Sequence, residues 1–257
     1  MKAYNGRRAY KLITRALRMP VFSLIDEFER VESFSRDQLE AYQWQKLQKL
    51  IHHAVSYSPY YRKLFDDMGA EPGDIKDRAA FEQIPLLTKE TVRASAEDIL
   101  VNPRSFFLNE AKTSGSTGLP LKIYKDPVGR ASTYAAMYRG HLWHGVGVGA
   151  REARLWSVPT AGLNKGKTIL KDIALNRFRQ KNARPDESTF SDFLEKIEKF
   201  GPLYLMGYPS LIYQFARYIH ETGFNSRPFN LSFVKCTAEV LYPHQKDLIE
   251  KLFGCPC

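Results

Sequence analysis

The sequence predicts an α/β fold in which helices flank mixed sheets, and the last quarter of the chain carries the clearest evidence. Short apolar runs at 203–206 and 231–236 have the length and composition of buried strands. Amphipathic helices are expected to begin at Pro209 and near His244, after these two runs. Strands that alternate with helices in this way are typical of a sheet with crossover helices.

The rest of the chain also shows helix and strand signals. Ser35-Arg36-Asp37-Gln38 is a capping box, and the helix that it begins should end near Ser58-Pro59, because the residue before proline avoids helical dihedral angles. We expect Thr88 to cap a further helix, another helix after Pro127, and strands at 121–124 and 153–158. The predicted core faces of two later helices are Phe190, Phe193, Leu194, Ile197 and Phe200, and Leu211, Ile212, Phe215, Ala216 and Ile219.

The formal net charge of +10 is concentrated near the N-terminus, where six basic residues precede the first acidic residue, Asp26. On a helix ending at Pro20, Arg8, Lys11, Arg15 and Arg18 would lie opposite an apolar face. The basic residues are Lys2, Arg7, Arg8, Lys11, Arg15 and Arg18, and the apolar face is Ala9, Leu12, Ile13, Ala16 and Leu17. One interpretation is an anchor that lies on a membrane surface. The other is a terminal helix that is docked on the body or frayed, which the absence of Trp and Phe before Phe22 favours.

The composition bears on where the protein is located and on whether it binds a metal. No apolar stretch approaches the roughly 18–20 residues of a membrane span, and no cleavable leader is evident near Met1. The three cysteines give no even disulfide framework, so we expect reduced thiols in the cytoplasm, with residues 1–20 offering contact with the inner face of the membrane. The pair His52-His53 lies within a helix, where adjacent residues face different directions, so no metal site is predicted.

The stretch from Thr113 to Lys122 is the most informative segment of the chain. Glycines let a backbone approach a polyphosphate closely, and hydroxyls and exposed N–H groups supply hydrogen bonds. The spacing of Gly115 and Gly118 does not fit the P-loop pattern, so the chemistry of P-loop nucleoside triphosphatases is disfavoured. A flexible linker is the alternative, but a linker rarely ends in a proline and an alternating strand. Ser114 and Ser116 have no recognisable His and Asp partners, so a serine hydrolase is also disfavoured, and no catalytic residue is predicted.

At this loop the sequence resembles the adenylate-forming enzymes, whose phosphate loop reads T-S-G-[ST]-T-G-x-P. Every defined position is matched by Thr113, Ser114, Gly115, Ser116, Thr117, Gly118 and Pro120. Further segments resemble the phenylacetate–coenzyme A ligase branch, which includes the CapK-like proteins near capsular polysaccharide genes. They are Ser58-Pro59-Tyr60-Tyr61-Arg62, Leu86-Leu87-Thr88-Lys89, Gly207-Tyr208-Pro209-Ser210 and Ala238-Glu239.

The resemblance implies a two-step ligase reaction. A carboxylate attacks MgATP to form an acyl-adenylate, and coenzyme A then takes the acyl group as a thioester. The residues that it assigns to the ATP phosphates are Thr113, Ser114, Gly115, Ser116, Thr117 and Gly118, with Lys122 as a neighbour. The residues that it assigns to an adenine and acyl pocket are Tyr208, Ser210, Ala238 and Glu239. Thr237 stands where the family has glycine, and Tyr208 and Ser210 have the alternative roles of a buried strand-end residue and a helix cap.

The resemblance also sets expectations about domains and activity. It covers about residues 35–257, so we expect a basic helical extension at 1–34 and an incomplete N-terminal domain of the family at 35–257, lacking its C-terminal part. The family's Tyr-Gly-x-x-Glu segment, which carries a magnesium ligand, and its C-terminal lysine do not occur in the chain. We therefore expect either a truncated enzyme or one piece of a split enzyme whose C-terminal half is on a separate chain. In both cases we expect the chain to be inactive alone, with a link to capsular or exopolysaccharide synthesis. The alternatives are a non-catalytic remnant that binds a nucleotide or a partner, and a basic peripheral membrane protein; nucleic acid is not an expected partner.

Overall fold

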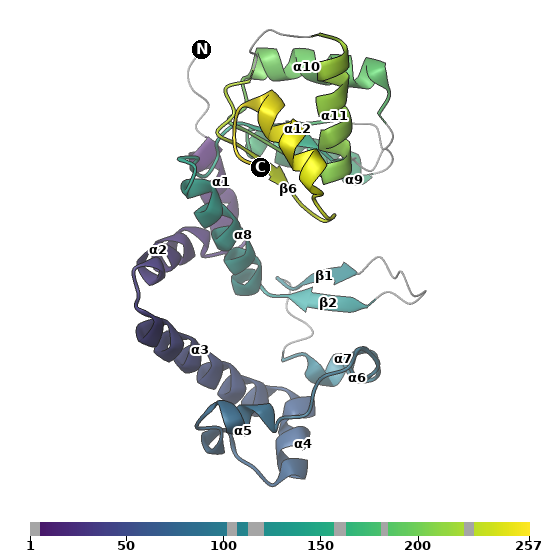
Figure 1. The fold of residues 1–257 in the computed structure, drawn as a ribbon. Coiled ribbons are helices and arrows are strands. Elements are labelled where there is room, and N and C mark those ends of the chain that lie inside the picture. The colour runs from purple at the N-terminus through teal and green to yellow at the C-terminus, as the bar shows by residue number, and fades with distance from the viewer. Residues whose placement is uncertain (1–5, 102–106, 113–120, 157–162, 181–184, 224–228) are drawn as a thin grey trace. The chain divides into compact units, whose positions relative to one another are not determined.

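The computed structural model describes residues 6–101, 107–112, 121–156, 163–180, 185–223 and 229–257 (Figure 1). The chain forms two compact units. The split unit comprises Met1–Ala16 and Ala136–Cys257, and the middle unit comprises Leu17–Ala135. The domain boundary expected at residue 34 stays a prediction.

The middle unit consists of helices and a two-stranded antiparallel sheet. Its elements are α2 (Val21–Glu32), α3 (Arg36–Tyr57), α4 (Pro59–Met68), η1 (Pro72–Asp74), α5 (Arg78–Glu82), α6 (Lys89–Ala94), α7 (Ala96–Ile99), β1 (Asn109–Lys112), β2 (Lys122–Lys125) and the start of α8 (Pro127–Leu142). A small core gathers around Ile51, Phe65 and Ile75.

Side-chain caps explain where the helices of the middle unit begin. The capping box at Ser35 is present: Gln38 N–H donates to Ser35 Oγ, and Ser35 N–H donates to Gln38 Oε1. Ser58 ends α3 and caps α4, and its buried hydroxyl donates to Asp98 O at 2.8 Å. Thr88 caps α6 as expected, because Thr91 N–H donates to its Oγ1 at 3.1 Å. The strand expected at 121–124 is present as β2, shifted by one residue.

The split unit contains a four-stranded parallel sheet with strand order β4-β3-β5-β6. Parallel pairing requires crossover connections, which the intervening helices provide. Its elements are α1 (Gly6–Ala16), the end of α8, β3 (Glu152–Leu155), α9 (Leu163–Ala174), β4 (Arg177–Arg179), α10 (Glu187–Phe200), β5 (Tyr204–Gly207), α11 (Pro209–Glu221), β6 (Phe233–Cys236) and α12 (Pro243–Phe253).

One side of this sheet packs on the main hydrophobic core. Ala153, Leu155, Leu205 and Val234 contribute from the strands, and α10, α11 and α12 contribute their apolar faces. The predicted inner residues of α10 and α11 are buried there, except that Phe200 and Leu211 are only half-buried. The 3.6-residue period therefore predicted this layer correctly.

Strand residues that alternate with the core residues carry charge, which the sequence analysis did not predict. The Glu152 carboxylate is buried, forms an ion pair with Arg154, lies 3.6 Å from Arg177 Nε, and accepts a hydrogen bond from Tyr204 Oη at 2.8 Å. Asp172 on α9 pairs with Arg179. Each buried carboxylate is thus compensated by guanidinium groups, as a low-dielectric environment requires.

The basic N-terminal segment forms α1, which is docked within the split unit. Tyr10 is buried and its ring lies 5.4 Å from that of Tyr138, edge to face. The backbones of Gly6 and Gly149 approach so closely that a Cβ on Gly6 would lie 2.5 Å from Gly149 O. The packed face of α1 is therefore Gly6, Tyr10 and Thr14, and not the expected apolar face, whose Leu12 is 70% exposed. No helix among the described residues combines the length and apolarity needed to cross a bilayer.

We expect His141 to make the stability of the split unit depend on pH. Burial, helped by the positive charge of Lys235, lowers the pKa of this histidine from 6.5 to about 4; Glu152 opposes this shift, and His144 and Arg154 add to it. The unfolded chain therefore binds the proton more tightly than the folded chain does. The stability that comes from keeping His141 neutral is complete above pH 6.5 and is lost as pH falls toward 4. The loss is about 2 kcal/mol after allowance for solvent screening.

Urea denaturation of the wild type and of His141→Phe between pH 4.5 and 7.5 measures this dependence. The substitution should flatten the pH dependence of stability, because it removes the titrating imidazole. The aromatic neighbours of His141 can pack against the phenyl ring that replaces it. The matched control is His52→Phe, at an exposed position on α3. An unchanged pH profile for His141→Phe would contradict the assignment.

Candidate functional site

The carboxyl edge of the parallel sheet gathers the residues of the candidate site. β3, β5 and β6 end in register at Leu155, Gly207 and Cys236, so the segments that follow them emerge side by side. Thr237 N–H donates to Gly207 O at 3.1 Å and continues the pairing one residue further. In open α/β sheets ligands bind outside the carboxyl ends of the strands, so a ligand site is expected at this edge.

Gly207 permits the close packing from which this edge is built. A Cβ at Gly207 would lie 2.6 Å from Leu155 O and 3.2 Å from Ile212 Cγ1, so any larger residue would push the strands or α11 apart. Tyr208 then follows in an extended conformation, and Pro209 begins α11.

An aromatic pair covers part of the edge. The rings of Trp156 and Tyr208 are stacked with centroids 4.4 Å apart and an angle of 26° between their planes. Both residues are half-buried, so the pair retains an accessible surface. The sequence analysis singled out Tyr208 but not Trp156, which falls inside the strand expected at 153–158 and belongs to no recognisable motif.

Glu239 lies at the N-terminus of α11. Its Oε2 accepts a hydrogen bond from Ser210 N–H at 3.1 Å, and Ala238 adopts the left-handed conformation, with φ of 69°. A carboxylate in this place satisfies a free N–H group and interacts favourably with the helix dipole. The structure thus brings Ser210 and Glu239 together, as two of the residues assigned to one pocket. Ser210 is the second residue of the helix and not its cap, which is Tyr208.

Gln180 adds a buried amide just beyond β4. It is 4% exposed, and its backbone N–H donates to Arg154 O at 2.9 Å. Neither side-chain amide atom has a hydrogen-bond partner within the described parts of the chain. Buried amides are normally paired, so Gln180 is a further polar group that a water or a ligand could satisfy. The sequence showed no pattern that singled it out.

The residues assigned to the ATP phosphates, 113–118, lie outside the described residues. Lys122, the last residue of that assignment, begins β2 in the middle unit and is exposed, and it faces Lys112 across the hairpin. The described residues hold no group of three His, Cys, Asp or Glu side chains placed to bind a metal ion. At the sheet edge Glu239 is the carboxylate assigned to the pocket, and its Oε2 already accepts a hydrogen bond from Ser210 N–H on α11. The residues assigned to the pocket therefore do not fit a magnesium site.

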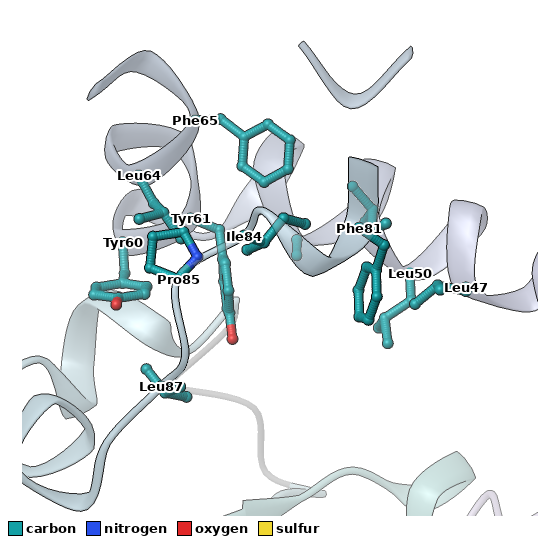
Figure 2. A pocket seen from close by; sticks show the side chains of 12 residues that line it. Leu47, Leu50, Tyr60, Tyr61, Leu64, Phe65, Phe81, Ile84, Pro85 and Leu87 are labelled. Atoms are coloured by element: carbon teal, nitrogen blue, oxygen red, sulfur yellow. The ribbon is translucent and has the colours of Figure 1, made fainter. Parts of the chain in front are cut away.

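A separate pocket of about 300 Å³ lies in the middle unit between α3, α4 and the segment after α5 (Figure 2). Its polar side-chain atoms are tyrosine hydroxyls, and burial raises the pKa of Tyr61. An apolar lining of this kind does not suit a polyphosphate. The lining residues are Leu47, Leu50, Ile51, Ala54, Tyr60, Tyr61, Leu64, Phe65, Phe81, Ile84, Pro85 and Leu87.

Comparisons with known proteins agree with the resemblance seen at the loop. The chain is 26% identical over 184 residues to protein CapK of Staphylococcus aureus, covering 69% of this chain and 40% of CapK. It is 33% identical over 98 residues to the phenylacetate–coenzyme A ligase of Aromatoleum evansii, covering 38% of this chain and 22% of the ligase. No family model matches the chain.

Solved structures show the same fold. A 2-hydroxyisobutyryl-CoA ligase in complex with 2-HIB-AMP and CoA superposes with a TM-score of 0.66 at 22% identity, over 88% of this chain and 49% of that one. An open conformation of that ligase gives a TM-score of 0.65. The chain thus spans about half of this solved structure and a smaller share of the curated relatives. Together the matches support the adenylate-forming enzyme family, in its CapK and phenylacetate–coenzyme A ligase branch, over part of the relatives' length.

Proposed function

We propose that this chain is the ATP-binding part of an AMP-forming acyl–coenzyme A ligase-like enzyme. In this function a carboxylate is activated as an acyl-adenylate and then transferred to coenzyme A. The observation that carries the proposal is the complete match of residues 113–120 to the phosphate loop of the adenylate-forming enzymes. The likeness to CapK and to the phenylacetate–coenzyme A ligases supports it.

The loop is assigned the β- and γ-phosphates of MgATP. Gly115 and Gly118 let the backbone approach the phosphates, and Thr113, Ser116 and Thr117 supply hydroxyl donors. Charge-assisted hydrogen bonds contribute roughly 1.5–3 kcal/mol each, and millimolar affinity needs only about 4 kcal/mol. Two or three such contacts therefore suffice for binding, and Lys122 adds a mobile positive charge.

The sheet edge is assigned the adenine and acyl part of the ligand. Trp156 and Tyr208 offer a flat aromatic surface, and Glu239 with Ser210 fixes the neighbouring loop. Because Glu239 already caps α11, the N-terminus of this helix is not open to an anion. This arrangement favours a neutral or aromatic group at the edge.

Replacement of Gly115 by aspartate is expected to weaken ATP binding at least about tenfold. The added carboxylate would compete with a phosphate group for the same position and would repel its negative charge. Isothermal titration with MgATP measures the affinity, and circular dichroism checks the fold of each variant. Gly73→Asp is the matched control, since Gly73 is exposed in the same unit and a Cβ there meets nothing within 4 Å. If the wild-type chain fails to bind ATP at millimolar concentration, the proposal is wrong.

ATP–pyrophosphate exchange over a panel of aryl and aliphatic carboxylates tests the adenylation step. Exchange that depends on a carboxylate and disappears in Gly115→Asp supports adenylation by this chain. ATP binding without exchange supports the alternative of a nucleotide-binding protein that does not itself adenylate.

A further inference from the structure

Two of the three cysteines of the chain face each other. Cys236 is the last residue of β6, and its Sγ lies 3.2 Å from Sγ of Cys257, within hydrogen-bond distance. Both residues are half-buried and therefore reachable by a small oxidant. Both are free thiols in the structure.

The backbone holds the two thiols in this position. Val234 N–H donates to Pro256 O at 2.8 Å, which fixes the segment 255–257 alongside β6. Cys257 N–H donates to Glu250 Oε1 at 2.9 Å, which ties the same segment to α12. Phe253 and Cys255 are buried in the main core and anchor it further. The thiol contact is thus a product of the packed fold and not of a chance side-chain rotamer.

We propose that Cys236 and Cys257 form an oxidisable dithiol, a redox modification site that closes to an intramolecular disulfide when the protein meets a hydroperoxide. The bond would tie the segment 255–257 covalently to the end of β6, one residue before Thr237 and the loop that carries Glu239. Its formation does not depend on ATP binding or on ligase activity.

The chemistry balances with the hydroperoxide as the two-electron oxidant. The Cys257 thiolate attacks the terminal peroxide oxygen, the O–O bond breaks, and the alcohol leaves after taking a proton, which gives a sulfenic acid. Sγ of Cys236 then attacks the sulfenic sulfur, the S–S bond forms, and the hydroxyl group leaves as water with the Cys236 proton. Two thiols and one hydroperoxide thus yield one disulfide, one alcohol and one water.

The surroundings assign the roles of the two thiols. The hydrogen bond from Cys236 lowers the pKa of Cys257, and Lys246 acts in the same direction while burial and Glu250 oppose it. The same hydrogen bond, with burial and the charge of Glu239, raises the pKa of Cys236. Burial raises the pKa of Cys255 to about 11, so this third cysteine remains a thiol and serves as an internal control.

Mass spectrometry of the full chain after treatment with hydrogen peroxide tests the proposal. The reduced protein, alkylated under denaturing conditions, takes up three labels, one for each cysteine. The oxidised protein should take up one label and lose the mass of two hydrogen atoms. After digestion with trypsin, the peptide that begins at Cys236 should remain joined by a disulfide to the peptide that follows Lys251. Fragmentation of this pair should place the bond at Cys257.

Matched variants make the outcome decisive. Cys255→Ala should still form the bond, whereas Cys236→Ser and Cys257→Ser should each abolish it, and circular dichroism verifies that each variant is folded. In the wild type the oxidised form should melt about 5 °C higher than the reduced form, and dithiothreitol should reverse the shift. Retention of three labels, a bond that involves Cys255, or linkage only between two chains would overturn the proposal.

Discussion

Replacement of Glu152 by alanine is expected to destabilise the split unit by about 3–5 kcal/mol, the cost typical of breaking a buried ion pair from one side. The carboxylate is 3% exposed, and its partners Arg154 and Arg177 have side chains that are 15% and 9% exposed. Burial raises the pKa of Glu152, but Arg177 and Arg154 outweigh burial and hold that pKa below its usual range. The group is therefore a carboxylate, and its removal leaves Arg154 without this carboxylate partner, while Arg177 keeps Asp172, whose Oδ1 lies 3.7 Å from Arg177 Nε.

The same experiment carries its own control. Glu195 forms an exposed ion pair with Lys199 one helical turn away on α10, with side chains 63% and 79% exposed. Glu195→Ala should change the free energy of unfolding by less than about 0.5 kcal/mol. Urea denaturation followed by circular dichroism compares the two variants, and similar losses for both would refute the importance of the buried network.

Replacement of Phe215 by alanine is expected to cost about 3–5 kcal/mol, because it opens a cavity in the main core. The Phe215 side chain is fully buried, and its ring lies 5.2 Å from that of Phe193 and 5.5 Å from that of Phe190. These neighbours belong to a different helix, α10, so the cavity would loosen the packing of α11 against it.

Phe81→Ala is the control for this prediction, since Phe81 is 38% exposed and lines the open pocket in the middle unit. Differential scanning calorimetry of both variants gives the comparison. A smaller loss for Phe215→Ala than for Phe81→Ala would show that the core around α11 relaxes to fill the space.

The contrast between these two sites shows what the sequence could predict. Phe215 lies on a helix whose apolar residues recur every three or four positions, so its burial follows from local spacing. Glu152 begins a strand that was expected at 153–158 and is instead β3, Glu152–Leu155, and its partners come from β3, β4 and β5. No local pattern shows that charges distant in sequence will compensate one another.

The strands β1 and β4 were missed for a related reason. Their sequences, Asn-Glu-Ala-Lys and Arg-Phe-Arg, are polar, and pairing with neighbouring strands defines them more than propensity does. α9 was also missed, because no recognisable start signal precedes it.

The candidate site divides in the same way. Tyr208, Ser210, Ala238 and Glu239 could be named because short motifs resemble those of a known family. Their mutual placement follows from the parallel register of β5 and β6, which brings the two motifs to one edge. Trp156 and Gln180 belong to the same edge through β3 and β4, but they carry no motif, so only the fold reveals them.

The backbone contact between Gly6 and Gly149 has a consequence for synthesis on the ribosome. α1 leaves the exit tunnel before the middle unit, yet the residues on which it packs follow only after the whole middle unit has been translated. At about 5–20 residues per second, roughly ten seconds pass before its docking surface exists. During that interval the nascent chain exposes a basic helix with Tyr10 uncovered, so the split unit can complete its fold only after translation has passed the sheet.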